Sequence, residues 1–234
     1  MVEIGDRPIL WHIMKHYARF GHKEFILCLG YLGDVIKHHF LHYKAYNSDI
    51  VVELGSHSAV RTLSSHEEQD WSVTLADTGL DANTGARVKA IEKYLAGDNF
   101  LLTYGDGLSN VDVNKLIEFH EGHGKLCTVT AVHPPARFGE IGLDCGKVAC
   151  FSEKPQTSAG LINGGFMVMR RDAVKGIGTD EGISLEHEVL TRLAGENELM
   201  AYEHDGFWQC MDTVRELTIL RDLWDSGEAP WRAI

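Results

Sequence analysis

Long apolar runs are absent from this sequence. Apolar stretches such as residues 25–29 and 101–104 are far shorter than the roughly 20 residues that a membrane-spanning helix needs. The N-terminus carries Glu3 and Asp6 where a secretory signal peptide would carry positive charge. The sequence therefore argues against a membrane protein and against a cleaved export signal, and it predicts a cytoplasmic protein.

Cysteine is scarce, and positive charge is in the minority. The five cysteines are scattered without a CxxC pair, which argues against a disulfide framework and a zinc knuckle. The chain has 22 lysine and arginine residues against 34 aspartate and glutamate residues, a net charge of −12. Because that charge repels a phosphate backbone, we expect no nucleic acid partner. Small phosphorylated substrates fit if a metal ion and a few local cations neutralise them.

The pattern of the chain indicates one α/β domain, residues 1–234. No linker rich in proline, glycine or serine divides it, and no internal repeat is present. Short apolar runs alternate with amphipathic stretches, which predicts β-α units that feed a mainly parallel sheet. After Gly124 strand-like runs follow one another, so additional β structure is expected in the C-terminal half. The expected helices are 8–21, 34–46, 88–95, 111–123, 185–194 and 213–225, and the expected strands are 24–29, 49–54, 71–76, 100–104, 127–133, 141–151, 162–169 and 199–203.

Two segments depart from this alternation. Residues 56–70 are polar without a convincing period, and we predict a loop or an excursion of the chain there. The first element of the chain is a helix, although open α/β sheets normally begin with a central strand and a ligand-binding turn. The first strand of the sheet is therefore expected to be missing from this sequence.

Asp106 is the leading candidate for a ligand-binding carboxylate. It follows an apolar strand within Gly105-Asp106-Gly107, at the strand end where open α/β sheets bind ligands, and the glycines let a phosphate or metal approach the backbone. A tight turn with a solvent-facing aspartate explains the motif equally well.

Asp212 is the second candidate carboxylate. It lies in a largely apolar stretch, 206–213, and it also precedes the last helix, where an aspartate makes a normal N-cap. Two aspartates that converge on Mg²⁺ suit phosphoryl or nucleotidyl transfer, because Mg²⁺ prefers hard oxygen ligands. Asp106 and Asp212 are therefore a testable pair.

Three further segments carry weaker signals. Lys154, beside Glu153 and before a proline, offers a compact cation for a phosphate, although exposed Glu-Lys pairs are common. The motif at 162–166 suits a hydroxylated ligand, and a hairpin or bulge explains its glycines as well. Residues 84–87 combine a helix start with Arg87 and could face a base or phosphate, or form an ordinary capped helix.

Taken together, these segments resemble the glucose-1-phosphate cytidylyltransferases, within the wider sugar-nucleotide pyrophosphorylase family. The resemblance covers nearly the whole chain. Shared elements are the Gly-Asp-Gly motif at 105–107, Glu-Lys-Pro at 153–155 and Asn-Gly-Gly-Phe at 163–166. The elements specific to the cytidylyl branch are the run 8–15, the TGxR element at 84–87 and the FWQxMDT ending at 207–213.

The resemblance implies a fold, a function and a role for each motif. The implied fold is a Rossmann-like mixed sheet flanked by helices, with added β structure. The reaction is transfer of a cytidylyl group from CTP to α-D-glucose 1-phosphate, giving CDP-glucose for surface-sugar biosynthesis, and members commonly form homo-oligomers. The implied Mg²⁺ ligands are Asp106 and Asp212, and Lys154 meets the sugar phosphate. The nucleotide-binding positions are Thr84, Gly85, Arg87 and Gly105, and the sugar-phosphate positions are Glu153, Lys154, Asn163 and Gly164.

This sequence departs from the family pattern at three places. Ala86 and Cys210 replace the usual glycine and proline. Family members also carry an N-terminal strand and a GGxGTR loop before the point where this sequence starts, so we expect this chain to have little transferase activity and marginal stability. The alternatives are UTP or dTTP as the nucleotide, or a non-catalytic sugar-phosphate or nucleotide-binding protein.

Overall fold

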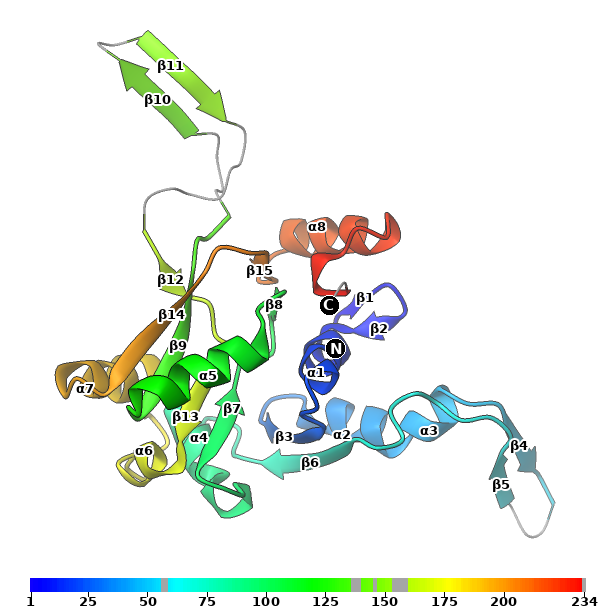
Figure 1. Cartoon of the computed structure of the whole chain (residues 1–234). Coiled ribbons are helices and arrows are strands. Elements are labelled where there is room, and N and C mark those ends of the chain that lie inside the picture. Colours follow the sequence, from blue (N-terminus) through cyan, green and yellow to red (C-terminus); the bar gives the residue numbers. More distant parts are fainter. Residues whose placement is uncertain (56–58, 136–139, 145–146, 153–159, 233–234) are drawn as a thin grey trace.

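The computed structural model of the chain describes residues 1–55, 59–135, 140–144, 147–152 and 160–232. It has the expected α/β architecture, in which helices alternate with strands in the N-terminal half (Figure 1). The helices are α1 (Ile9–Arg19), α2 (Gly33–Leu41), α3 (Tyr43–Tyr46), α4 (Thr84–Ala90), α5 (Val113–His123), α6 (Arg171–Lys175), α7 (Thr191–Gly195) and α8 (Val214–Asp225), with short 3₁₀ turns η1 (Glu92–Tyr94) and η3 (Pro230–Arg232) and a π-helical segment η2 (Leu185–Leu190).

The strands form one large sheet and several pairs. They are β1 (Glu3–Ile4), β2 (Arg7–Pro8), β3 (Glu24–Leu29), β4 (Ile50–Glu53), β5 (Ala59–Thr62), β6 (Ser72–Asp77), β7 (Asn99–Leu102), β8 (Gly107–Ser109), β9 (Cys127–Val132), β10 (Glu140–Asp144), β11 (Lys147–Ser152), β12 (Ile162–Asn163), β13 (Met167–Arg170), β14 (Leu199–His204) and β15 (Trp208–Cys210). In the large sheet, β9 pairs with β13 antiparallel and with β14 parallel, and β13 also pairs with β7. The sheet is therefore mixed, as the successive strand-like runs after Gly124 predict.

A separate pair, β3 and β6, is parallel, with Phe25 opposite Val73. A second short pair, β8 and β15, is antiparallel. Within the described residues, β3 forms no ladder with β7, so the parallel pair stands apart from the large sheet.

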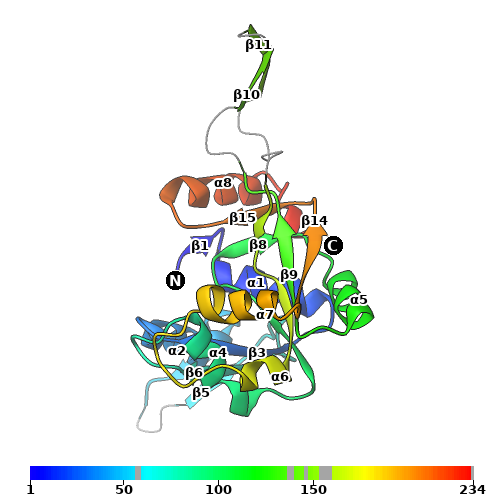
Figure 2. The ribbon, with the colours of Figure 1, turned by 90° about the vertical axis from the view of Figure 1, so that its left-hand side faces the viewer.

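Two apolar cores cover the two faces of the strands. One core contains residues of α1, α5 and α8, and the other contains residues of α4, α6, η2 and α7. Neighbouring residues of one strand contribute to different cores: Val168 of β13 belongs to the first, and Met167 and Met169 belong to the second. Figure 2 shows the same division, with α5 and α7 on opposite sides of β9 and β14. This alternation is what a sheet covered on both faces requires.

Helix boundaries follow local capping chemistry. The side chain of Asp112 accepts a hydrogen bond from the backbone nitrogen of Lys115 and begins α5, and Gly124, with φ of 66°, ends it in the left-handed conformation. Asn83 caps α4 through the backbone nitrogen of Thr84, so this helix begins at Thr84 rather than at residue 88. The cap, rather than the apolar periodicity, sets where α4 starts.

Three expected elements differ from the structure. The predicted loop 56–70 contains β5, which pairs antiparallel with β4, a partner that local periodicity cannot reveal. The predicted strand 141–151 is a hairpin of β10 and β11, and the predicted helix 34–46 is interrupted at His42 between α2 and α3. The hairpins β4–β5 and β10–β11 both extend away from the rest of the chain (Figure 1).

The predicted strand 162–169 is divided by a bulge. Both β12 and β13 pair with β9, but Ile162 lies opposite Val132 whereas Val168 lies opposite Thr128, so the register shifts by two residues between them. Gly165 in the bulge has φ of 76°, and the buried Phe166 has φ of 44°, a conformation that is costly for a residue with a side chain. The glycines of this motif therefore serve the bulge.

No helix in the described ranges is long and apolar enough to span a bilayer.

Candidate functional site

The ladder of β8 and β15 brings the two candidate aspartates to one place. Cys210 lies opposite Gly107, and beyond them the backbone nitrogen of Met211 donates to the carbonyl oxygen of Asp106 at 2.9 Å. Asp212 is the next residue along the chain. The Gly-Asp-Gly segment and the FWQxMDT segment, about a hundred residues apart in sequence, are therefore adjacent in the fold.

The electrostatics of Asp106 reflect this neighbourhood. The pKa of its carboxyl is raised, first because neighbouring protein atoms remove part of its hydration and then because the negative charge of Asp212 lies nearby. By accessible surface, Asp106 and Asp212 are both exposed. Two neighbouring carboxylates that repel each other form a donor set that a hard divalent cation would stabilise.

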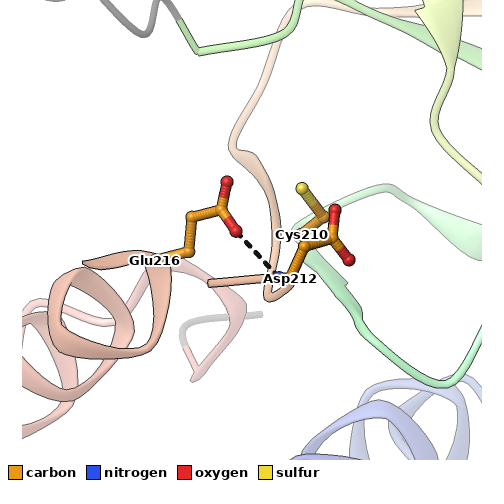
Figure 3. A group of neighbouring side chains, drawn as sticks. All are labelled: Cys210, Asp212 and Glu216. Carbon is orange, nitrogen blue, oxygen red and sulfur yellow. Dashed lines mark hydrogen bonds between the residues drawn. The ribbon is translucent and has the colours of Figure 1, made fainter. Parts of the chain in front are cut away.

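Asp212 also belongs to a cluster with Cys210 and Glu216, whose ligand atoms lie within 4.8 Å of one another (Figure 3). Glu216 is engaged otherwise: its carboxylate accepts hydrogen bonds from the backbone nitrogens of Asp212 and Thr213, each at 2.8 Å. Burial, followed by the charges of Glu216 and Asp212, raises the pKa of the Cys210 thiol to about 11. Sulfur is also a soft ligand, whereas Mg²⁺ prefers hard oxygen ligands.

The cap of α8 corrects one sequence interpretation. The N-cap is Thr213, in a capping box with Glu216, and not Asp212. Asp212 lies one residue before the cap, and its side chain is not used to begin the helix. The carboxylate of Asp212 therefore does not cap α8, which was the structural role that the sequence suggested.

The segment 84–87 is held tightly by its surroundings. The Arg87 guanidinium donates to the Thr78 hydroxyl at 2.7 Å and to the carbonyl oxygens of Gly79 at 2.9 Å and Leu29 at 3.2 Å. None of these acceptors is a carboxylate, so the positive charge of Arg87 is not neutralised by them. A side chain on Gly85 would lie 2.9 Å from the carbonyl oxygen of Ile183, which shows that this glycine packs against protein.

Gly105 differs from Gly85. It is exposed, and a Cβ placed on it would meet no atom within 4 Å. The space beside Gly105 is therefore open to a ligand.

Glu186 is a residue of this region that the sequence analysis missed. Its carboxylate accepts hydrogen bonds from the hydroxyls of Tyr104 at 2.6 Å, Thr84 at 2.8 Å and Ser184 at 2.9 Å. Burial by itself raises the pKa of Glu186, but these hydrogen bonds outweigh it and the net shift is downward. No local motif marks the residue, because its partners lie up to 102 positions away.

The same network reaches the 163–166 motif. The Asn163 amide donates to the Tyr104 hydroxyl at 3.1 Å, and its oxygen accepts from the backbone nitrogen of Gly165 at 3.0 Å. Gly164 is buried: the Trp208 indole donates to its carbonyl oxygen at 2.7 Å, and a Cβ there would lie 2.7 Å from Val132. Tyr104 and Glu186 thus connect Asn163 to Thr84.

Two predicted sugar-phosphate residues, Glu153 and Lys154, lie outside the described residues.

A cavity of about 1180 Å³ opens beside these segments. At the end nearest the candidate residues it is lined by Thr84, Arg87, Tyr104, Gly105 and Met211. The predicted nucleotide-binding positions Thr84, Arg87 and Gly105 therefore share one cavity, next to the aspartate pair.

Comparison with known proteins agrees with this arrangement. A family model described as nucleotidyl transferase matches residues 1–214. Glucose-1-phosphate cytidylyltransferase of Salmonella typhi is 46% identical over 235 residues, with 99% of this chain and 90% of the relative covered. Mannose-1-phosphate guanyltransferase of Saccharomyces cerevisiae is 25% identical over 217 residues, with 89% of this chain and 54% of the relative covered.

Solved structures carry the same fold. HddC from Yersinia pseudotuberculosis, in a crystal structure complexed with GMP-PN, superposes with a TM-score of 0.68 at 18% identity, covering 96% of this chain and 88% of that one. At this identity the likeness concerns the fold alone. The chain is therefore similar across nearly its whole length to a glucose-1-phosphate cytidylyltransferase. Because the family model also matches most of the chain, the chain belongs to the nucleotidyl transferase family.

Proposed function

We propose that the chain acts in transfer of a cytidylyl group from CTP to α-D-glucose 1-phosphate, with CDP-glucose and pyrophosphate as products. The observation that carries the proposal is the juxtaposition of Asp106 with the segment of Asp212 beside an open cavity, in a chain 46% identical to a glucose-1-phosphate cytidylyltransferase. The lower identity to a guanyltransferase, 25%, favours cytidine over guanine as the base.

The reaction exchanges one phosphorus–oxygen bond for another. A phosphate oxygen of the sugar phosphate attacks the α-phosphorus of CTP, and the bond from that phosphorus to the oxygen bridging the β-phosphate breaks. Pyrophosphate leaves with the bonding electron pair, so no oxidant or reductant is needed. The protein chiefly has to align two anions and stabilise the negative charge that develops.

Enzymes of this family generally use a divalent metal, and the residues present fit Mg²⁺. Asp106 and Asp212 would hold it, because their carboxylates are hard oxygen donors whose mutual repulsion a cation relieves. When bound, Mg²⁺ would neutralise phosphate charge in the substrate complex. Cys210 takes no part in this assignment, because its sulfur is a soft ligand.

The remaining residues are proposed to bind the two substrates. Nucleotide binding is assigned to Thr84, Gly85, Arg87 and Gly105, with Arg87 as a cationic neighbour and Gly105 as the point of close approach. Gly85 contributes indirectly, because the lack of a side chain lets α4 pack closely against the backbone at Ile183. Sugar-phosphate binding is assigned to Glu153, Lys154, Asn163 and Gly164. A homo-oligomer and a role in surface-sugar synthesis complete the proposal.

Pyrophosphate release tests the proposal. The purified chain, glucose 1-phosphate and Mg²⁺ are incubated in turn with CTP, UTP, dTTP and GTP. We expect measurable release of pyrophosphate with CTP and at least tenfold slower release with the other three nucleotides. A low rate with CTP would agree with the low activity predicted from the sequence. A preference for UTP or dTTP would overturn the assignment of the nucleotide. Thermal stabilisation by CTP with no pyrophosphate release would favour a non-catalytic binding protein.

The metal assignment has a separate test. Mn²⁺ replaces Mg²⁺ as a paramagnetic probe, and its affinity is measured by electron paramagnetic resonance. We expect Asp106→Asn and Asp212→Asn each to weaken Mn²⁺ binding roughly tenfold or more, since each removes a charged donor. Asp222→Asn, at an exposed aspartate on α8, is the matched control and should leave binding unchanged. Equal binding by all three variants would place the ion elsewhere.

A further inference from the structure

A second cavity lies at the end of β7 that is away from the candidate site. It has a volume of about 370 Å³ and is lined by charged side chains, namely Glu92, Asp98, Arg170, Arg171, Asp172 and Lys175. Asp98 directly precedes β7, whereas Gly105 and Asp106 follow that strand. Among the described residues, this cavity shares no lining residue with the cavity of about 1180 Å³. A cavity lined by charged side chains indicates a charged ligand rather than an apolar one.

Two of the three carboxylates in this cavity already have a cationic partner. The Lys89 ammonium donates to the Glu92 carboxylate at 2.8 Å, and the Lys175 ammonium donates to the Asp172 carboxylate at 2.7 Å. The carboxylate of Asp98 is exposed, and the described residues provide it with no hydrogen bond or ion pair. The lysine and carboxylate charges therefore cancel in pairs, apart from Asp98.

The two arginines of the cavity have no anionic partner in the part of the chain that the structure describes. Arg170 and Arg171 are both half-buried. The Arg170 guanidinium donates to the carbonyl oxygen of Gly124 at 3.4 Å, which is a long contact to a neutral acceptor. For the Arg171 guanidinium, the described residues provide no acceptor. A partly desolvated guanidinium gains most from a charged acceptor, so this pair favours an anionic ligand.

Backbone hydrogen bonds fix the positions from which these two side chains extend. Arg170 is the last residue of β13 and lies opposite Asn99, and its backbone nitrogen donates to the carbonyl oxygen of Leu126 at 2.8 Å. The backbone nitrogen of Arg171 donates to the carbonyl oxygen of Asp98 at 2.7 Å. The backbone of the site is therefore ordered before a ligand binds, which reduces the entropy lost on binding.

We propose that this cavity binds a phosphate group, held by the guanidinium groups of Arg170 and Arg171. A guanidinium can donate two parallel hydrogen bonds to phosphate oxygens, and two guanidinium groups balance the charge of a phosphate dianion. The volume of about 370 Å³ is near the lower limit for small-molecule sites, roughly 300–1,000 Å³. The cavity therefore has room for inorganic phosphate or for a small phosphate monoester. Asp98 lines the same cavity and repels the ligand, so it limits the affinity.

This phosphate site does not rest on the proposed transferase activity. None of the residues that line it is assigned to CTP, glucose 1-phosphate or Mg²⁺. Failure of pyrophosphate release would leave the phosphate site standing, because its test measures binding at the two arginines and no turnover.

Nuclear magnetic resonance of the arginine Nε–H groups tests the proposal on the intact chain. Inorganic phosphate is titrated into the isotope-labelled chain at constant ionic strength, with sodium chloride as the compensating salt, because unspecific attraction of anions is screened equally at every point. We expect saturable shifts of the Arg170 and Arg171 resonances. The resonance of Arg61, an exposed arginine on β5, should show no saturable shift. Each resonance is assigned from its absence in the corresponding arginine-to-glutamine variant.

Variants on both sides of the charge balance sharpen the test. Arg171→Gln should weaken phosphate binding, measured at Arg170, roughly fivefold or more, because one of the two cations is lost. Arg171→Lys should weaken it less, because the charge stays while the paired donors are lost. Asp98→Asn should strengthen binding roughly twofold or more, because a neighbouring negative charge is removed. Arg61→Gln is the matched control and should leave the affinity unchanged.

Saturable shifts at both arginines, with tighter binding in Asp98→Asn, support the proposal. Shifts that rise linearly at every arginine, saturation at Arg87 alone, or no gain in affinity in Asp98→Asn would overturn it. A parallel titration with glycerol 3-phosphate identifies the source of the phosphate group. Tighter binding than that of inorganic phosphate assigns the site to a phosphate monoester, and equal or weaker binding assigns it to free phosphate.

Discussion

The glycines at 85 and 105 share a predicted ligand-binding role, yet the structure places them in opposite surroundings. In Gly85→Ala, the new Cβ would lie 2.9 Å from the carbonyl oxygen of Ile183 and 3.0 Å from the backbone nitrogen of Leu185. Backbone atoms cannot rotate away as a flexible side chain can. Helix α4 and the segment at Ile183 therefore have to move apart.

The cost follows from what that movement disturbs. The carbonyl oxygen of Ile183 accepts from the backbone nitrogen of Ala86 at 3.1 Å, and the backbone nitrogen of Leu185 donates to the Thr84 hydroxyl at 2.8 Å. Overpacking of this kind costs about 1–3 kcal/mol, and the better helix propensity of alanine returns at most about 1 kcal/mol. We expect a net loss of about 1–2 kcal/mol, or a Tm lower by roughly 2–8 °C for a chain of this size.

Thermal and urea denaturation of both glycine variants provide the measurement. Gly105→Ala is the matched control, because its Cβ meets nothing within 4 Å, and it should change stability by less than about 0.5 kcal/mol. It should nevertheless weaken CTP binding if the nucleotide approaches this backbone. A Gly85→Ala variant as stable as the parent would refute the packing argument, and a destabilised Gly105→Ala would refute the contrast between the two positions.

Three further predictions concern single side chains. Glu186→Ala should lower the free energy of unfolding in urea by about 2–3 kcal/mol, because the hydroxyls of Tyr104 and Thr84 lose a charged acceptor. Glu186→Gln should lower it clearly less, and equal losses of stability would contradict the role of the hydrogen bonds. Thr213→Ala should cost about 0.5–2 kcal/mol through loss of the α8 cap, whereas Thr213→Ser should stay within a few tenths. Burial lowers the pKa of His16 from 6.5 to about 4, so its neutral form stabilises the fold above about pH 6.5 and that contribution is lost as the pH falls toward 4. His120 shows a similar shift, so both proteins should lose stability in acid, but His16→Leu should lose about 2 kcal/mol less than the parent between pH 7 and pH 5; identical pH profiles would refute the assignment.

Sequence patterns predicted the elements that depend on local chemistry. The strand 24–29 and the helix that the structure ends at His123 follow from apolar runs and turn residues. The prediction of a single strand at 141–151 was wrong because β10 and β11 pair with each other, and β5 was missed because only its pairing with β4 makes it a strand. Propensity describes a segment alone, whereas sheet pairing depends on residues elsewhere.

The candidate site shows the same limit. Its glycines and aspartates could be picked out from the sequence because they form short motifs that resemble a family. Glu186 and Trp208 could not be assigned roles, since one joins Tyr104 to Thr84 and the other donates to Gly164 across 44 positions. Side chains that position a site through distant partners leave no local pattern.

The left-handed backbone of Phe166 links the bulge to helix α1. Its ring stacks on Tyr17 with centroids 5.8 Å apart, and its carbonyl oxygen accepts from the Thr130 hydroxyl at 2.6 Å. A conformation that costs of order 1–3 kcal/mol persists only while such contacts hold it. Undocking of α1 would therefore release the bulge that orients Asn163, so the proposed sugar-phosphate position and the attachment of the first helix are thermodynamically coupled.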